Sequence, residues 1–166
     1  MSLSEPLPLL ADQLADGDII DFGDVPPEVN LLLQQGVAAY YDDRPRADSI
    51  FRQALAQAPD QLPVYFCLYK IHTYQGHLDE ALDVARIGLA MAARQAAMPE
   101  NWEDWPERLP TQGPARFAVY TLKAMAFIHL RRGEAAESRR ILAKLAAMGP
   151  DDGLGSSVIA DIAAKM

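Results

Sequence analysis

The feature that most constrains the fold is a pattern that recurs along the chain. One copy of the pattern is a small residue, an aromatic residue, a second small residue and a proline, at Ala47, Phe51, Ala54 and Pro59. Ala81 stands 34 residues after Ala47. A period of about 20–50 residues is typical of chains in which one small supersecondary unit stacks on the next. The sequence therefore predicts a row of similar units.

A further unit follows after an insertion. Gly133 stands 57 residues after Gly76, which is one 34-residue period plus 23 additional residues. In the same frame His129 matches His72, and Pro150 matches the earlier proline. The agreement of several positions in one frame indicates three copies, with the additional residues between the second and the third.

The units have the apolar spacing of helices. Segments 47–57, 81–93 and 138–147 each place their apolar residues on a single helical stripe. Gly76 and Gly133 each follow a long apolar segment, where a glycine commonly ends a helix. We therefore expect an all-α fold with helix pairs at 28–42 and 46–58, 62–75 and 78–97, and 114–132 and 135–148, followed by a helix near 156–165.

These recurring positions resemble the tetratricopeptide-repeat family. The resemblance covers about three degenerate repeats in residues 28–150, with the insertion at about 94–114. It implies an antiparallel helix-hairpin solenoid whose first helices line a concave groove. Residues 151–166 would then be a capping helix, and residues 1–27 a separate acidic segment. The ending Pro150–Ala164 is similar to small tetratricopeptide proteins encoded near nitrogen-fixation genes.

Charge is unevenly distributed. The formal net charge is −8, yet residues 1–30 hold seven acids and no base, and residues 116–144 hold seven bases and two acids. The overall acidity argues against a nucleic-acid partner, because phosphate would meet a repulsive field. The local basic stretch favours an acidic protein or peptide as partner.

The sequence predicts a cytoplasmic bacterial protein. It has no apolar stretch of about 18 residues that could span a membrane. No Lys or Arg precedes Arg44, which argues against a standard secretory signal. The excess of arginine over lysine and the many alanines fit a GC-rich bacterial genome.

The candidate groove combines cations and aromatic rings. Spacing places the side chains of the third unit's first helix on one helical face, and the matching slots of the other two units add further members. Such residues suit an extended or helical peptide with acidic and apolar side chains. The alternative is that the aromatic residues pack against neighbouring helices. The predicted groove residues are Tyr40, Phe66, Lys70, Tyr74, Arg116, Tyr120, Lys123, Phe127 and Arg131.

Two further segments have two interpretations each. The insertion holds Trp102 and Trp105, which either fill a gap between the second and third repeats or contact a partner or a second copy. Residues 4–24 mix Leu and Ile with Asp, so this acidic segment is either a disordered tail or lies in its own basic groove or that of a neighbour.

Nothing in the sequence indicates catalysis, a metal or a cofactor. His72 and His129 occupy the same repeat slot, as core histidines would. Cys67 lies in an apolar run, which favours an inert buried thiol. Phosphate-binding glycine loops and the usual hydrolase and zinc motifs are missing. Paired aspartates such as Asp42 and Asp43 fall where turns favour Asp.

These observations predict a non-enzymatic adaptor that binds a partner protein or peptide in its groove. One alternative is a chaperone like the small acidic three-repeat chaperones of type III secretion, which the chain resembles in size and repeat number. The other is a structural homo-oligomer. A chaperone-tail clamp is excluded, because its five slots hold Leu32, Gly36, Cys67, Tyr120 and Ala124 here.

Overall fold

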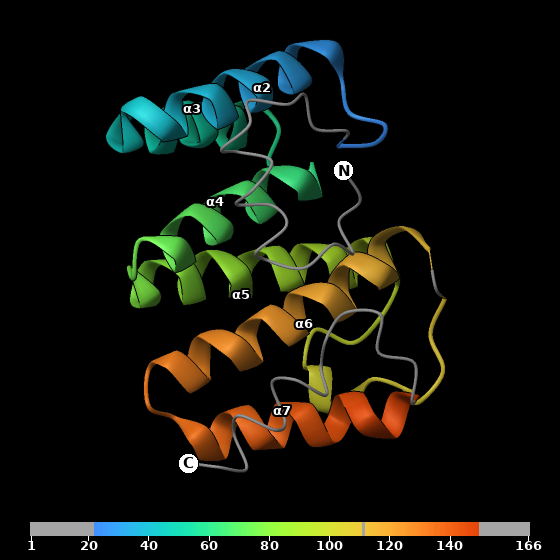
Figure 1. Ribbon diagram of the computed structural model, residues 1–166. Coiled ribbons are helices and arrows are strands. Elements are labelled where there is room, and N and C mark those ends of the chain that lie inside the picture. Colours follow the sequence, from blue (N-terminus) through green and yellow to red (C-terminus); the bar gives the residue numbers. More distant parts are fainter. Residues whose placement is uncertain (1–21, 111, 150–166) are drawn as a thin grey trace.

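The structure, a computed structural model, describes residues 22–110 and 112–149 and is all-α over these residues, as predicted. The acidic segment up to residue 21 and the helix expected near 156–165 lie outside the described residues. The labels are those of Figure 1. The helices are α2 (Pro27–Asp42), α3 (Arg44–Gln57), α4 (Leu62–Tyr74), α5 (Leu78–Gln95), α6 (Gly113–Arg131) and α7 (Ala135–Met148), with a short 3-10 helix η1 (Trp102–Asp104).

The six helices form three consecutive pairs that lie in a row. Figure 1 shows α2 with α3 at one end, α4 with α5 in the middle and α6 with α7 at the other end. Each helix packs against the next one along the chain, and α4 also contacts α2 and α6. The first helices of successive pairs therefore lie next to one another. None of the helices of the described residues is long and apolar enough to cross a membrane.

Helix α3 begins two residues earlier than predicted, at Arg44, because Asp43 caps it. The Asp43 side chain accepts a hydrogen bond of 3.1 Å from the backbone N–H of Arg46, and Pro45 occupies the first turn. Asp is a favoured N-cap, and proline in the first turn loses no helical hydrogen bond. The turn between α2 and α3 is therefore a helix start rather than a loop.

Equivalent turns join the two helices of the second pair and of the third pair. After α4, the N–H groups of Gly76 and His77 donate to the carbonyls of Thr73 and His72 at 3.1 and 2.8 Å, and Gly76 has a φ of +78°. The same two bonds recur 57 positions later around Gly133, whose φ is +81°. This is the Schellman termination of a helix, which requires a left-handed residue. The 57-residue offset read from the sequence is thus present in the backbone.

Helix α5 ends with the same geometry but without a glycine. The N–H of Met98 donates to the carbonyl of Ala93 at 2.8 Å, and Ala97 takes the left-handed position with a φ of 56°. An L-residue other than glycine is disfavoured there by about 1 kcal/mol. The helix therefore stops at Gln95, two residues before the predicted end.

A close approach of two helices fixes the first pair. A Cβ on Gly36 of α2 would lie 2.7 Å from Cζ and 2.8 Å from Cδ1 of Phe51 on α3, and Phe51 is buried. Glycine at this position lets the Phe51 ring rest on the α2 backbone. The core then continues from Phe22, which is buried, through all three pairs to Leu145 of α7.

Candidate functional site

Helix α4 is buried on nearly all sides. Every residue from Leu62 to Thr73 is buried, so this helix is sandwiched between its neighbours and has no single apolar face. Lys70 lies within this helix and is 1% exposed. Lys123 of the neighbouring α6 is 6% exposed. Two lysines are thus withdrawn from bulk water where α4 and α6 meet.

Tyr120 joins these lysines. The ammonium of Lys70 donates a 2.5 Å hydrogen bond to the Tyr120 hydroxyl and lies 4.9 Å from the centroid of its ring. The Lys123 ammonium lies 4.7 Å from the same centroid. Phe66 completes the group, 5.1 Å from the Lys70 ammonium and 5.8 Å from the Tyr120 ring. We name Phe66, Lys70, Tyr120 and Lys123 the α4–α6 cluster.

The cluster places two lysines at a buried site. Loss of hydration lowers the pKa of Lys70 well below its ordinary value, and repulsion from Lys123 lowers it further. Among the ion pairs of residues 22–110 and 112–149, no carboxylate pairs with Lys70. The aromatic faces and the Tyr120 hydroxyl stabilise the ammonium in part. Such a site favours an anionic group near it.

Further predicted groove residues lie at the border of the cluster. The Arg131 guanidinium donates a 2.7 Å hydrogen bond to the Thr73 carbonyl and lies 5.9 Å from the ring centroid of Phe127. Arg131 is exposed, whereas Phe127, Tyr74 and Arg116 are partly buried. Together these residues place charge and apolar surface around the buried lysines.

The structure brings together the predicted residues of the second and third pairs but not that of the first. Tyr40 lies on α2, where the Arg44 guanidinium is 5.3 Å from its ring centroid. Among the described residues, none of the hydrogen bonds, ring contacts or cation–ring contacts joins Tyr40 to the α4–α6 cluster. The four cluster residues are buried, so the open lining expected from helical spacing does not apply to them. Tyr120 packs against a neighbouring helix, because its ring contacts Phe66 of α4. This arrangement corresponds to the alternative in which the aromatic residues pack against neighbouring helices.

The repeat frame does not indicate the cluster. With the 57-residue offset, Phe66 corresponds to Lys123 and Lys70 corresponds to Phe127. The contacts instead join both lysines to Tyr120, and Lys70 to Phe66 of its own helix.

The insertion packs on α7. Trp105 is 2% exposed, and its indole N–H donates to the Pro99 carbonyl at 2.7 Å. The Lys144 ammonium donates to the carbonyls of Trp105 and Glu103 at 2.6 and 3.1 Å. Trp105 is therefore an interior residue, and the gap-filling interpretation of the insertion stays a prediction. Trp102 is partly buried, with the Arg140 guanidinium 4.9 Å from its ring centroid, and its role as a partner contact stays a prediction.

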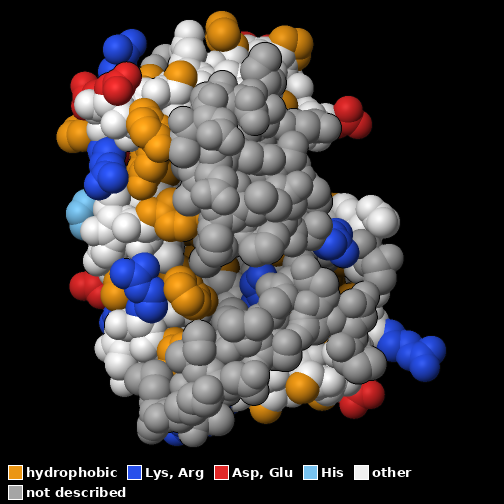
Figure 2. Space-filling view, in the orientation of Figure 1, with side chains coloured by type: hydrophobic (Ala, Val, Ile, Leu, Met, Phe, Trp, Pro, Cys, Tyr) orange, Lys and Arg blue, Asp and Glu red, His pale blue; other side chains and the backbone are white. Residues whose placement is uncertain are grey.

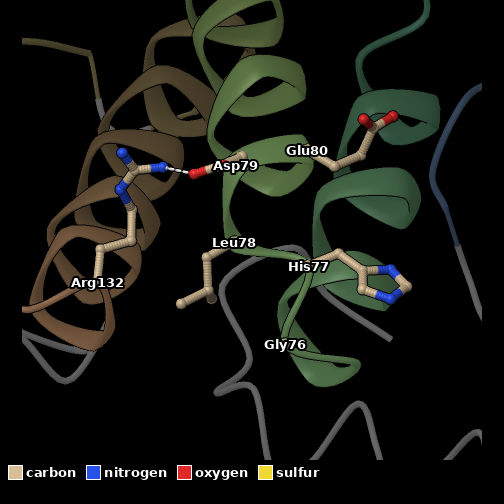
Figure 3. Close-up of a pocket in the computed structure, with 6 residues that line it drawn as sticks. All are labelled: Gly76, His77, Leu78, Asp79, Glu80 and Arg132. Carbon is tan, nitrogen blue, oxygen red and sulfur yellow. Dashed lines mark hydrogen bonds and ion pairs between the residues drawn. The ribbon is translucent and has the colours of Figure 1, made fainter.

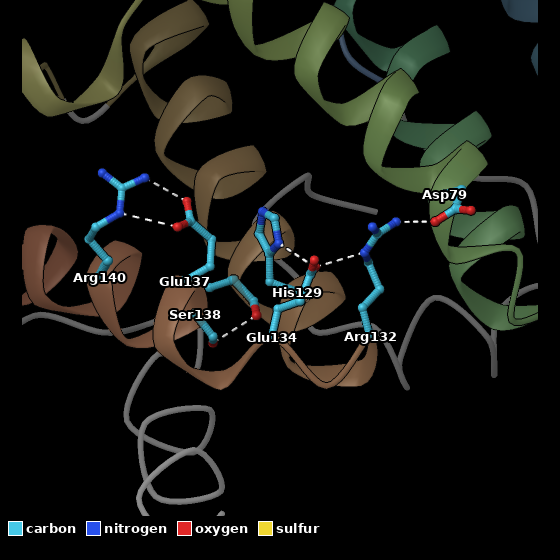
Figure 4. Close-up of polar contacts among 8 residues, drawn as sticks. Asp79, His129, Arg132, Glu134, Glu137, Ser138 and Arg140 are labelled. Carbon is cyan, nitrogen blue, oxygen red and sulfur yellow. Dashed lines mark hydrogen bonds and ion pairs between the residues drawn. The ribbon is translucent and has the colours of Figure 1, made fainter.

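Polar contacts among the described residues account for several bases of the stretch 116–144. Figure 4 shows a chain of contacts in which Arg132 bonds Asp79 of α5 and Glu134, and Glu134 also bonds His129. Hydrogen bonds from His129 and then Arg132 lower the pKa of Glu134. Figure 4 also shows the pair formed by Arg140 with Glu137. The Ser138 hydroxyl donates a 2.8 Å hydrogen bond to the Ala126 carbonyl. Sequence spacing alone did not reveal these partners.

A shallow polar pocket lies at the start of α5. It is lined by Gly76, His77, Leu78, Asp79, Glu80 and Arg132. Figure 3 shows Arg132 directed at Asp79 from one side of α5, with Glu80 and His77 on the other side. Glu80 pairs with Arg52 of α3. The start of α5 thus forms ion pairs with both neighbouring helix pairs, through Glu80 with Arg52 and through Asp79 with Arg132.

The other candidate groups are structural in this arrangement. His72 accepts or donates toward His77 at 3.2 Å and bonds Asp48 of α3 at 2.6 Å. Burial raises the pKa of the Cys67 thiol, which keeps it protonated and poorly nucleophilic. Within the described part of the chain, no group of three His, Cys, Asp or Glu side chains could hold a metal ion.

The positive side chains of the visible surface are spread out. On the face drawn in Figure 2, Lys and Arg lie singly among apolar and acidic side chains of the described residues. The described residues visible on this face form no continuous basic patch of the kind that follows a nucleic-acid backbone.

Comparison with known proteins gives one similar chain. No family model matches this protein, and no solved structure matches it. It is similar to the "Uncharacterized 19.8 kDa protein in nifW 5'region" of Azotobacter chroococcum mcd 1. The two are 27% identical over 125 residues, a stretch that covers 72% of this chain and 70% of that protein. The name of that protein gives a genomic position and no activity.

Proposed function

We propose that this protein is a non-enzymatic adaptor of tetratricopeptide-like architecture that binds an acidic, partly apolar segment of a partner protein over the α4–α6 cluster. The observation that carries the proposal is the buried Lys70, which lies beside Lys123 and has no paired carboxylate among the described residues. A partner carboxylate would supply the missing opposite charge.

The chemistry of the cluster suits a carboxylate better than a neutral group. Hydrogen bonds between an ammonium and a carboxylate are roughly twice as strong as neutral ones. The low-polarity surroundings formed by Phe66 and Tyr120 strengthen that attraction. Phe127 and Tyr74 at the border offer aromatic contact area for apolar side chains of the same segment. Charge and apolar surface therefore occur side by side.

The repeat architecture supports the same proposal. Three helix pairs in a row, with the equivalent turns at Gly76 and Gly133, fit the two-helix repeats of a tetratricopeptide array. In such an array the first helices carry the binding face, and the cluster is formed by two of them, α4 and α6. The chaperone and homo-oligomer alternatives stay predictions.

The test measures binding of an acidic probe by fluorescence polarisation. The probe is a fluorescein-labelled peptide of alternating Leu and Asp, and the control peptide has Asn in place of Asp. Replacing Lys70 and Lys123 by Met should weaken binding of the acidic probe about tenfold or more. The control peptide should bind weakly to both proteins.

A matched variant controls for net charge. Arg86→Gln with Arg108→Gln removes the same two charges at exposed positions away from the cluster, and it should leave the affinity within about twofold. If the double Met variant loses helical circular dichroism, Arg131→Gln at the exposed border replaces it and should weaken the probe about threefold or more. Equal affinity of the folded cluster variant and the charge control would refute the proposed function.

A further inference from the structure

The segment that precedes the described residues carries the charge that the cluster calls for. Residues 1–21 contain five acids and no base, and their acids alternate with Leu and Ile. This composition matches the acidic, partly apolar segment that the proposed function assigns to the partner. The five acids are Glu5, Asp12, Asp16, Asp18 and Asp21.

We propose that residues 1–21 of the same chain occupy the α4–α6 cluster and that a partner segment binds by displacing them. The inference rests on the proposed function, because both need a cluster that accepts acidic segments. It adds an occupant and a form of regulation, in which the chain's own acidic segment competes with the partner.

Burial and charge together support this occupant. Lys70 is 1% exposed, and a buried cation is unfavourable unless an anion compensates it. The ion pairs of residues 22–110 and 112–149 provide no carboxylate for Lys70. Residues 1–21 hold five acids and no competing base.

The attachment of the segment makes the contact within one chain feasible. Phe22, the residue that follows it, is 5% exposed and belongs to the core. From this anchor, 21 residues could extend up to about 70 Å, whereas α6 is about 28 Å long. Attachment within one chain over such a length gives an effective concentration of about 1 mM. The chain's own segment therefore has an advantage over the same segment on a second copy.

Competition predicts how much the segment should suppress partner binding. If the segment binds the cluster with a Kd of about 0.1 mM, a local concentration of about 1 mM lowers the apparent affinity of an external peptide about tenfold. Neutralising the segment should therefore tighten binding of the acidic probe by a similar factor.

The experiment uses the full chain with Asp12→Asn, Asp16→Asn and Asp18→Asn. Its control, Asp60→Asn with Asp83→Asn and Glu107→Gln, changes the net charge equally at exposed positions that form no ion pair with another described residue. One measurement is the Kd of the acidic probe. The other is the rate at which acetic anhydride acetylates each lysine, read by mass spectrometry.

We expect the segment variant to bind the probe about tenfold more tightly than the control variant and to acetylate Lys70 and Lys123 faster. Unchanged acetylation rates would overturn the inference, whether or not the probe binds. Faster acetylation without any probe binding would support the occupant and refute the proposed function instead. Protection that appears only at high protein concentration would show a second copy's segment in the cluster and would also overturn the inference.

Discussion

Replacing Lys144 by methionine should release the insertion from α7. The Lys144 ammonium donates to the carbonyls of Trp105 and Glu103 at 2.6 and 3.1 Å. Hydrogen bonds from a charged donor contribute about 1.5–3 kcal/mol each. Lys144 is only partly buried, so solvent takes over part of this interaction. We expect the free energy of unfolding to fall by about 2–3 kcal/mol.

Arg140 provides the comparison, because it lies one turn earlier on α7 and contacts the same insertion. Its ion pair with Glu103 is 2.6 Å long, but both side chains are about half exposed. Exposed ion pairs contribute about 0–1 kcal/mol, and the contact with Trp102 adds at most about 1 kcal/mol. Arg140→Met should therefore cost less than Lys144→Met.

Urea unfolding followed by circular dichroism gives both free energies, and tryptophan fluorescence shows where the structure changes. Both tryptophans of the chain lie in the insertion, so emission reports on this segment alone. Lys144→Met should shift the emission to longer wavelength and increase acrylamide quenching in the folded state. A larger loss for Arg140→Met than for Lys144→Met would refute the reasoning that charged hydrogen bonds to these carbonyls outweigh exposed ion pairs.

Three other substitutions test the packing, a helix end and a buried histidine. Gly36→Ala should lower the free energy of unfolding by about 1–3 kcal/mol in urea titrations, because its methyl group would overlap the Phe51 ring; added stability would contradict this packing. Ala97→Gly should raise the melting temperature by about 2–4 °C, since glycine removes the cost of the left-handed conformation; a lower value would contradict it. Burial lowers the pKa of the His72 imidazole below 6.5, so the unfolded chain binds a proton at this histidine at a higher pH than the folded chain does. The free energy of unfolding should therefore fall as the pH drops below about 6.5. His72→Gln should flatten the dependence of the melting temperature on pH in this range, and an unchanged slope would refute this role of His72.

The helices could be predicted because their signals are local. Apolar spacing and the glycines at 76 and 133 depend on residues within a few turns, and the resulting helix bounds agree with the structure to within two residues. The exact starts and stops depended on cap chemistry. Asp43 moved the start of α3 earlier, and Ala97 took a left-handed conformation that composition does not predict.

The site could be predicted only in part. Helical spacing correctly grouped Tyr120 and Lys123 on one face of α6, but spacing does not tell whether another helix covers that face. Here α4 does so in part, because it contributes the Lys70 hydrogen bond and the Phe66 ring. A lysine at a helix face is normally exposed, so the burial of Lys70 had no sequence signal.

The attachment of the insertion was also beyond sequence reasoning. Lys144 reaches carbonyls about 40 residues earlier in the chain, and Arg140 reaches Glu103 across a similar separation. Every residue has a backbone carbonyl, so the sequence does not indicate which carbonyl accepts a hydrogen bond from a distant side chain. Prolines and tryptophans indicated that the insertion is a compact loop, but not which helix it packs against.

Zero-length carbodiimide cross-linking tests the central claim most directly, because it joins a carboxylate to an amine only when the two are in contact. The chain has four lysines, at positions 70, 123, 144 and 165, so mass spectrometry assigns each product to one position. With the acidic probe and the full-length variant that carries the three Asp→Asn changes in residues 1–21, we predict products at Lys70 or Lys123. Products confined to the other two lysines, or none at all, would contradict a carboxylate-binding cluster between α4 and α6.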